Sequence, residues 1–552
     1  MARDTGGKTF EHFVGRSPLA LVKIQMSDRI DHGFKIVKTP EKRKMVWRQA
    51  WDPEMPRERR RRCGLIAGLF CRKPDFRTRR QEGFPVWAGR MAANLIKENP
   101  YVLTVDRAAA PPVSFWGRMR HLGPGLILTA SIVGSGELIG TTLFGARAGF
   151  ICFWVIIVSC LVKVALQLEF GKYAIYTGKS TMAALNGLPG PKWGAAGRKV
   201  GWAMWIWLVV MGVKVLQVGG IVGGVAVLLN LAIPAVPVVW WLVPAVGATC
   251  WLVSRGYRMI ERGSMVLTVL FTVLSVASLV ALQWTDKAVS SVEVMSGLTF
   301  HLPPEVVFYA WAAFGITGIG GDEILVYNYW LIEKGYAART GPRDDSPEWV
   351  ARAKGWIRVM KMDALLSMVV YTVVTAVFYL LGAAVLHRMN ELPQDSQLLE
   401  RLSIIYTEAL GPVGKWAYLG GGFAVLMSTL VAATGAWGRQ FADAAGQFGY
   451  INFLDPVARD RAIRFFTWLF PCLWALVFLA VRNSATMVMI GGAATMAVLF
   501  VVVYASLHFR RKALPPSLKP TRLYDVILGI SIVAILAVGV QALVSAVLKV
   551  LG

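Results

Sequence analysis

The sequence predicts an all-α, polytopic membrane protein. Of its 552 residues, 55% are hydrophobic and only 17% are charged. Apolar runs of about 20 residues, the length of a helix that spans a bilayer core, recur along the chain. These runs favour helices, because a membrane β-strand is shorter and alternates apolar with polar residues.

Eleven runs are predicted to cross the membrane, within a transmembrane domain that covers residues 116–552. They lie at about residues 124–147, 151–171, 202–229, 233–254, 263–283, 305–332, 364–387, 415–436, 465–482, 486–507 and 524–549.

The net charge of +26 is explained mainly by where the basic residues fall. Residues 1–120 hold 26 Lys and Arg against 12 Asp and Glu, a net charge of +14. Most of the remaining basic residues lie in alternate loops between the predicted spans. The predicted location is the cell (inner) membrane. The positive-inside rule then places the N-terminus in the cytoplasm and, with eleven spans, the C-terminus on the outside.

The basic arm at residues 1–115 shows no sustained periodicity and is predicted to be disordered and cytoplasmic. It contains RERRRRC at residues 57–63. One alternative is that Met91 is the true start, and another is that the arm binds anionic lipid headgroups. Nucleic-acid binding is not expected, because the arm lacks interleaved aromatic residues and a folded module.

Charged residues inside predicted spans are costly and therefore indicate function. Such residues occur in four spans, and they are Glu137, Lys163, Glu169, Lys214, Asp322 and Glu323. Lys163 and Glu169 lie toward one end of their span, where snorkelling or a local ion pair is expected. Lys214 lies near the middle of its span, so it is expected to pair with a carboxylate on another helix or to line a water-filled path.

Two glycine-rich segments resemble each other: VGSGELI (133–139) and IGGDEIL (319–325). They are 186 residues and five predicted spans apart. An odd number of spans per unit inverts the second copy, as in one class of secondary transporters whose first helix in each repeat is broken at the midplane. The predicted repeats cover about 123–283 and 305–507, and the helix at 524–549 is additional.

The two breaks define the candidate site for an ion or substrate, because glycine lets the backbone leave helical geometry. The residues predicted to form the breaks are Gly134, Gly136, Gly318, Gly320 and Gly321. The predicted ligands are the carboxylates of Glu137, Asp322 and Glu323, backbone groups at Gly134 and Gly320, and the hydroxyl of Ser135 or Thr317. The alternative is that these glycines serve close helix packing alone.

Residues from about 120 to 510 resemble the NRAMP family of divalent-metal transporters. The segment GPGLILTASIVGSGELIGTTLFGARAGFICFWV (123–155) is similar to that family's first span. Further similar segments are LQLEFGKYAIYTGKST (166–181), GYRMIERGSMVL (256–267), LGPVGKWAYLGGGFAVLMSTLVAATGAWGRQFA (410–442) and RDRAIRFFTWLFPCLW (459–474). The resemblance implies an eleven-span, LeuT-like fold of two inverted five-helix repeats, with helices 1 and 6 broken.

The candidate site departs from the family pattern. The family's aspartate and asparagine in the first span correspond to Gly134 and Glu137. Its Met-Pro-His in the sixth span corresponds to Gly320, Gly321 and Asp322. Two acids that the family associates with proton movement correspond to Lys214 and Gln217.

These departures favour a hard divalent cation, because carboxylate, carbonyl and water ligands suit Mg²⁺ and Mn²⁺ whereas sulfur and imidazole suit softer metals. We therefore expect a secondary transporter of Mg²⁺ or Mn²⁺ rather than Fe²⁺, without a permanently bound cofactor, and we favour a monomer. The alternative substrate is a small organic cation, an amine or an amino acid. Proton coupling is left open: neighbouring carboxylates could hold a proton, whereas Lys214 could act as a built-in counter-ion. No enzyme motif occurs in a supporting context.

Overall fold

The computed structural model describes residues 99–551 except 135, 196, 255–256 and 390–397. Residues 1–98 of the predicted arm and the predicted ligand Ser135 lie outside the described residues. The described part of the chain is mainly helical and contains one hairpin. In this hairpin, β1 (Lys192–Ala195) pairs antiparallel with β2 (Arg198–Gly201).

The first half of the described chain forms helices over the predicted spans and short helices between them. They are η1 (Val105–Arg107), α4 (Phe115–Met119), α5 (Pro124–Ile132), the π-helix η2 (Gly136–Thr141), α6 (Thr142–Ala148), α7 (Phe153–Thr177), α8 (Thr181–Asn186), α9 (Trp202–Ala232), α10 (Val238–Ser254), α11 (Tyr257–Leu282) and α12 (Ser291–Ser296).

The second half continues in the same way. Its helices are η3 (Pro304–Val306), α13 (Val307–Ile316), α14 (Gly321–Lys334), α15 (Tyr336–Thr340), α16 (Pro347–Leu381), η4 (Gly382–His387), α17 (Leu398–Leu410), α18 (Pro412–Phe448), α19 (Pro456–Val481), α20 (Ser484–His508), η6 (Phe509–Ala513), η7 (Pro516–Leu518) and α21 (Arg522–Leu551).

Eight helices among the described residues are long and apolar enough to cross a membrane, as in a multi-pass membrane protein. The first of these combines α5, η2 and α6. The remaining three predicted spans correspond to α10, to α11 and to the pair α13 and α14. Helix α10 and the part Thr272–Leu282 of α11 are apolar but shorter than 18 residues, and α13 and α14 are each shorter than that. The total of eleven crossings therefore stays a prediction.

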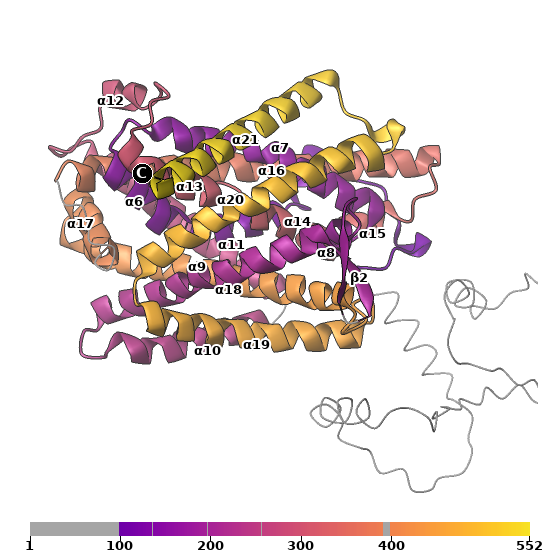
Figure 1. Cartoon of the computed structure of the whole chain (residues 1–552). Helices are drawn as coiled ribbons and strands as arrows, with labels where there is room; N and C mark the ends of the chain where they lie inside the picture. Colours follow the sequence, from indigo (N-terminus) through magenta and orange to yellow (C-terminus); the bar gives the residue numbers. More distant parts are fainter. Residues whose placement is uncertain (1–98, 135, 196, 255–256, 390–397, 552) are drawn as a thin grey trace, which may run out of the picture. The chain divides into compact units, whose positions relative to one another are not determined.

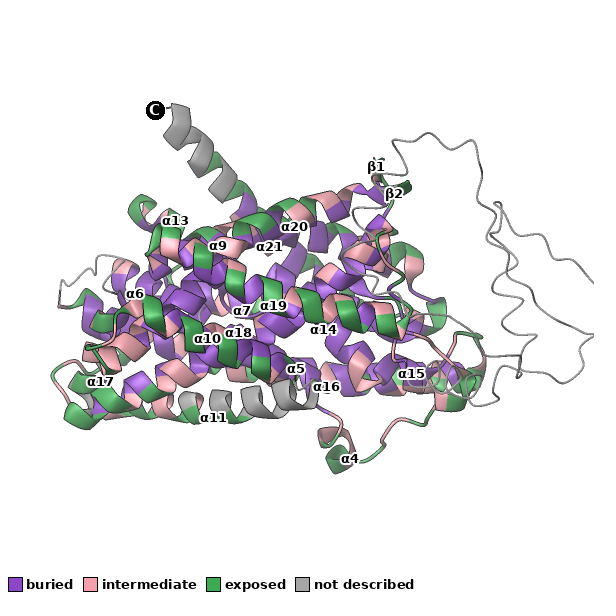
Figure 2. Ribbon diagram, turned by 90° about the horizontal axis from the view of Figure 1, so that it is seen from below, coloured by how far each residue is buried: buried purple, intermediate pink, exposed green. Residues whose placement is uncertain are grey.

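The long helices lie side by side, and their inner faces form one apolar core (Figure 1). Helix α9 packs along α18, α19 and α20, while α7 packs against α16. Figure 2 shows buried residues gathered on the inward faces, whereas α10 and α19 carry many exposed ones. Several of these exposed residues are large and apolar, including Trp240, Phe465 and Trp468. Such an outer surface suits contact with lipid rather than water.

Two helices of the core are interrupted near their middle. In the first predicted span, α5 ends at Ile132 and helical structure resumes as η2 at Gly136. In the sixth, α13 ends at Ile316 and α14 begins at Gly321. Both interruptions lie at the glycine-rich segments predicted to form the breaks, and they position the side chains of the candidate site.

Candidate functional site

The break in the sixth span, residues 317–320, is shaped by Gly318. Its φ angle is +60°, a conformation that L side chains rarely adopt. A Cβ atom at Gly318 would also lie 2.9 Å from the Cα of Cys160 in α7. The break is thus pressed against α7, and glycine meets both the conformational and the spatial requirement.

The end of α13 at this break is bound by two polar side chains of α7. The Lys163 ammonium donates to the carbonyl oxygens of Phe314 at 2.7 Å and Thr317 at 2.6 Å. The Ser159 hydroxyl lies 3.1 Å from each of the same two oxygens and 2.8 Å from the Thr317 hydroxyl. Lys163 and Ser159 therefore serve carbonyl groups that a helix end leaves without helical partners.

Lys163 differs from its sequence expectation, and Glu169 agrees with it. The Lys163 side chain is fully buried and binds backbone carbonyls, so it neither snorkels to a membrane surface nor forms a local ion pair. Glu169 does form a local pair, with Lys172 three residues further along α7. Spacing along α7 could not distinguish the two, because the partner of Lys163 is on another helix.

Glu137 follows the break in the first span and is also fully buried. One carboxylate oxygen accepts a hydrogen bond from the Thr141 hydroxyl at 2.5 Å. The other accepts from the backbone N–H of Gly318 at 3.3 Å. Glu137 thus connects the first broken span directly to the break in the sixth.

Asp322 and Glu323 lie in the first turn of α14, where the positive end of the helix dipole favours negative charge. The Lys214 ammonium of α9 forms an ion pair with Oδ2 of Asp322 and donates to the Thr495 hydroxyl of α20 at 3.1 Å. Among the described residues, Oδ1 of Asp322 and Oε1 of Gln217 are buried without a hydrogen-bond partner. Buried acceptors of this kind are satisfied in proteins by water, by an ion or by another donor.

One cavity is lined by Asp322, Glu323, Lys214 and Gln217. The centre of a water molecule can occupy about 40 Å³ of it. This is enough for an ion with a few waters. The other lining residues come mainly from α5, α9, α14 and α18, and are Ile127, Leu128, Ser131, Ile132, Gly136, Val218, Ile221, Ile316, Val326, Trp330, Thr429, Ala432, Ala433, Ala436 and Trp437. Glu137 is not among them.

The three predicted carboxylate ligands are therefore not brought together. Within the described residues, no group of three or more His, Cys, Asp and Glu side chains is placed to hold a metal ion. Asp322 and Glu323 share the cavity, whereas Glu137 and Thr317 are bound to other groups at the breaks. A ligand role for any of these residues stays a prediction.

The other glycines predicted at the breaks allow neighbouring atoms to come close to the backbone. A Cβ at Gly134 would lie 1.4 Å from the Thr429 hydroxyl oxygen of α18, and one at Gly320 would lie 2.3 Å from a carboxylate oxygen of Glu323. Gly136 lines the cavity, and Gly321 packs against Val498 of α20. Close helix packing thus explains the glycines at positions 134 and 321, in addition to their place at the helix breaks.

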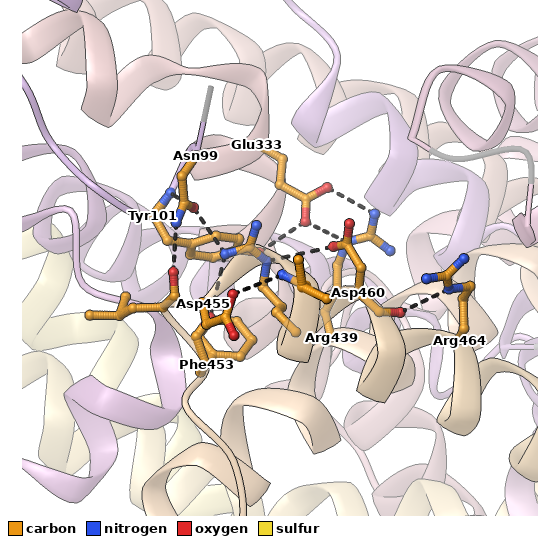
Figure 3. Close-up of polar contacts among 11 residues, drawn as sticks. Asn99, Tyr101, Glu333, Arg439, Phe453, Asp455, Asp460 and Arg464 are labelled. Carbon is orange, nitrogen blue, oxygen red and sulfur yellow. Dashed lines mark hydrogen bonds and ion pairs between the residues drawn. The ribbon is translucent and has the colours of Figure 1, made fainter. Parts of the chain in front are cut away.

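A polar network that the sequence did not reveal fastens the far end of α14 (Figure 3). Glu333 accepts from Arg439 of α18 in two hydrogen bonds, of 2.7 and 2.8 Å, and from the Tyr101 hydroxyl at 2.9 Å. The Arg439 guanidinium also lies 4.8 Å from the ring centre of Trp330, a cavity-lining residue. The network therefore joins α14 to α18 one helical turn beyond the cavity-lining Trp330.

The sequence is similar to a known protein family and to a characterised type of transporter. A model of the family described as Natural resistance-associated macrophage protein-like (Nramp) matches residues 125–545. The divalent metal cation transporter MntH of Staphylococcus saprophyticus is 26% identical over 376 residues, which make up 66% of this chain and 76% of that protein.

Two crystal structures of a manganese transporter from Eremococcus coleocola have a similar fold. A mutant form covers 81% of this chain and 96% of its own at 15% identity, with a TM-score of 0.56. A complex with an aromatic bis-isothiourea substituted compound covers 80% and 94% at 16% identity, with a TM-score of 0.55. At such identities the likeness shows the fold alone.

Proposed function

Because the chain belongs to the Nramp family, we propose that it is a secondary transporter that moves a hard divalent cation, Mg²⁺ or Mn²⁺, across a membrane. The family resemblance of the sequence is confirmed by the match over residues 125–545. The name of the MntH relative supports divalent metal cations as the substrate class. The choice among these cations rests on the chemistry of the cavity.

The observation that carries the proposal is the pair of acids at the start of α14. Asp322 and Glu323 line the cavity at the break, and one oxygen of Asp322 lacks a hydrogen-bond partner among the described residues. Among the described residues that line the cavity, none is His, Cys or Met. A site that offers only oxygen atoms and water suits Mg²⁺ or Mn²⁺ better than a metal that prefers sulfur or imidazole.

Lys214 supplies the positive charge that balances Asp322 in the empty cavity. The pair is buried, and its partners lie on different helices, α9 and α14. An arriving cation replaces the ammonium at Oδ2 of Asp322, and Lys214 retains the Thr495 hydroxyl as a partner. This arrangement supports the counter-ion alternative for Asp322, whose charge the cation takes over from Lys214 without a proton leaving that carboxylate.

The size of the cavity favours a metal ion over the organic alternative. Pockets for small organic ligands have volumes of roughly 300–1,000 Å³. In this cavity, the volume that the centre of a water molecule can occupy is only about 40 Å³. Release in an alternating-access cycle requires α14 to part from α18, where Glu333 binds Arg439. By the predicted topology, this end faces the cytoplasm.

The test is a substrate panel in proteoliposomes. Purified protein is reconstituted in liposomes, and Mg²⁺, Mn²⁺, Fe²⁺, amines and amino acids are offered outside. Metal-sensitive dyes inside the liposomes report metal flux, and radiolabelled amines and amino acids report their own uptake. We expect Mg²⁺ or Mn²⁺ flux that competing amines do not inhibit. Asp344→Asn, at an exposed loop residue, is the matched control and should transport like the wild type. Amine flux without metal flux would overturn the proposal.

A further inference from the structure

The break in the sixth span is held by two buried side chains of opposite charge that come from different helices. Lys163 of α7 binds the carbonyl groups at the end of α13, and Glu137 of η2 binds the amide of Gly318. Each side chain is fully buried. Neither lines the cavity that contains Asp322 and Glu323. Their common target is the backbone of the break.

The interactions match the polarity of the backbone groups. The C-terminal end of a helix carries partial negative charge on its free carbonyl oxygens, which an ammonium group stabilises. Lys163 therefore binds the end of α13 with the favourable sign. An amide N–H needs an acceptor, and the Glu137 carboxylate supplies it at Gly318. Loss of Glu137 leaves the Gly318 amide without this hydrogen bond, whereas loss of Lys163 leaves the carbonyl groups of Phe314 and Thr317 to the uncharged Ser159 hydroxyl alone.

The position of Asp322 depends on this break. Only residues 317–320 separate the end of α13 from α14, and Asp322 is the second residue of α14. Gly318 has a left-handed conformation that nothing in helix geometry fixes. The contacts from Lys163 and Glu137 therefore determine where the first turn of α14, with Asp322, meets Lys214.

We propose that Lys163 and Glu137 are positioning residues that hold the break of the sixth span and thereby place Asp322 in the cavity. The inference rests on the proposed function for the identity of the cargo. It assigns Glu137 a role other than the ligand role expected from the sequence. It also makes Glu137 a direct link between the two broken helices, so that a change in one is transmitted to the other.

The first test measures Mn²⁺ binding to detergent-purified, full-length protein. Lys163→Met and Glu137→Ala should bind Mn²⁺ about tenfold more weakly, the loss typical of groups that orient a metal ligand. Glu137→Gln keeps an oxygen that accepts from Gly318 and should stay within about threefold of the wild type. Lys172→Met, at another buried lysine of α7, is the matched control. Equal losses in Glu137→Gln and Glu137→Ala would show that the charge of Glu137 is required and would overturn the positioning role.

The second test does not depend on the cargo. Hydrogen exchange is followed for peptides that cover residues 314–323 in each variant that elutes like the wild type. Faster exchange is expected in Lys163→Met and Glu137→Ala, and unchanged exchange in Lys172→Met. If Asp322→Asn binds Mn²⁺ like the wild type, the proposed function fails while the exchange result still decides the positioning role. If Asp322→Asn loses binding but both positioning variants bind and exchange normally, only this inference fails.

Discussion

The two broken spans carry similar sequences but use their carboxylates differently. In the first span, both oxygens of Glu137 accept hydrogen bonds and the side chain lies outside the cavity. In the sixth span, Asp322 lines the cavity, pairs with Lys214 and retains one oxygen without a partner among the described residues. A glycine-rich break followed by an acid therefore does not determine what the acid does. The surrounding helices decide it.

The largest expected difference between the breaks is in transport. Asp322→Asn removes a charge from the cavity and leaves Lys214 without its counter-charge, so Mn²⁺ or Mg²⁺ flux into proteoliposomes should fall about 100-fold. Glu137→Gln, which preserves an acceptor for Gly318, should reduce the same flux by no more than about threefold. Equal effects of the two substitutions would remove the distinction between the two spans. Asp322→Glu, which retains the charge, controls for loss of folding.

The sequence predicts the main features of the fold because membrane spans need long apolar runs. It also locates both breaks, because glycine clusters and charges are rare in such runs. It does not reveal that Lys163 reaches the end of α13, because that contact joins residues 151 positions apart. Likewise, Glu333 and Arg439 lie near the ends of predicted spans, where charged residues are ordinary. Only the packing of α14 against α18 brings them together.

The second prediction concerns the counter-ion of Asp322. In Lys214→Met the carboxylate loses its ammonium partner in a buried site, where an unpaired charge costs about 3–5 kcal/mol. A proton then has to neutralise the site, and the arriving cation has to expel it. We expect flux to fall about tenfold and to become accompanied by proton movement out of the liposomes, which a pH-sensitive dye inside them reports as a rise in internal pH.

The wild type provides the contrast for this second prediction. With Lys214 present, cation entry should leave the internal dye signal unchanged. Proton movement of equal stoichiometry in the wild type and in Lys214→Met would show that Lys214 does not serve as the counter-ion.

The third prediction tests the geometry of the break in the sixth span. Gly318→Ala forces a side chain into a left-handed conformation and toward Cα of Cys160. This should destabilise the protein by about 1–3 kcal/mol, measured as a lower midpoint of thermal unfolding in detergent. Gly212→Ala is the matched control, since a Cβ at Gly212 in α9 meets no atom within 4 Å. An unchanged midpoint for Gly318→Ala would mean that the break adjusts without strain.

The smallest expected effect is at the opposite end of α14, far from its acids. Tyr101→Phe removes the 2.9 Å hydrogen bond to Glu333 but leaves both hydrogen bonds from Arg439 in place. A hydrogen bond to a charged group contributes about 1.5–3 kcal/mol, and the retained Arg439 contacts keep the loss near the lower value. Because this network joins α14 to α18, weakening it should favour parting of the two helices. We therefore expect the unfolding midpoint to fall slightly while the rate of cation release rises by a factor of about two to ten. A lower midpoint with an unchanged release rate would contradict this prediction. It would mean that the network stabilises the position of α14 but does not limit the rate of transport.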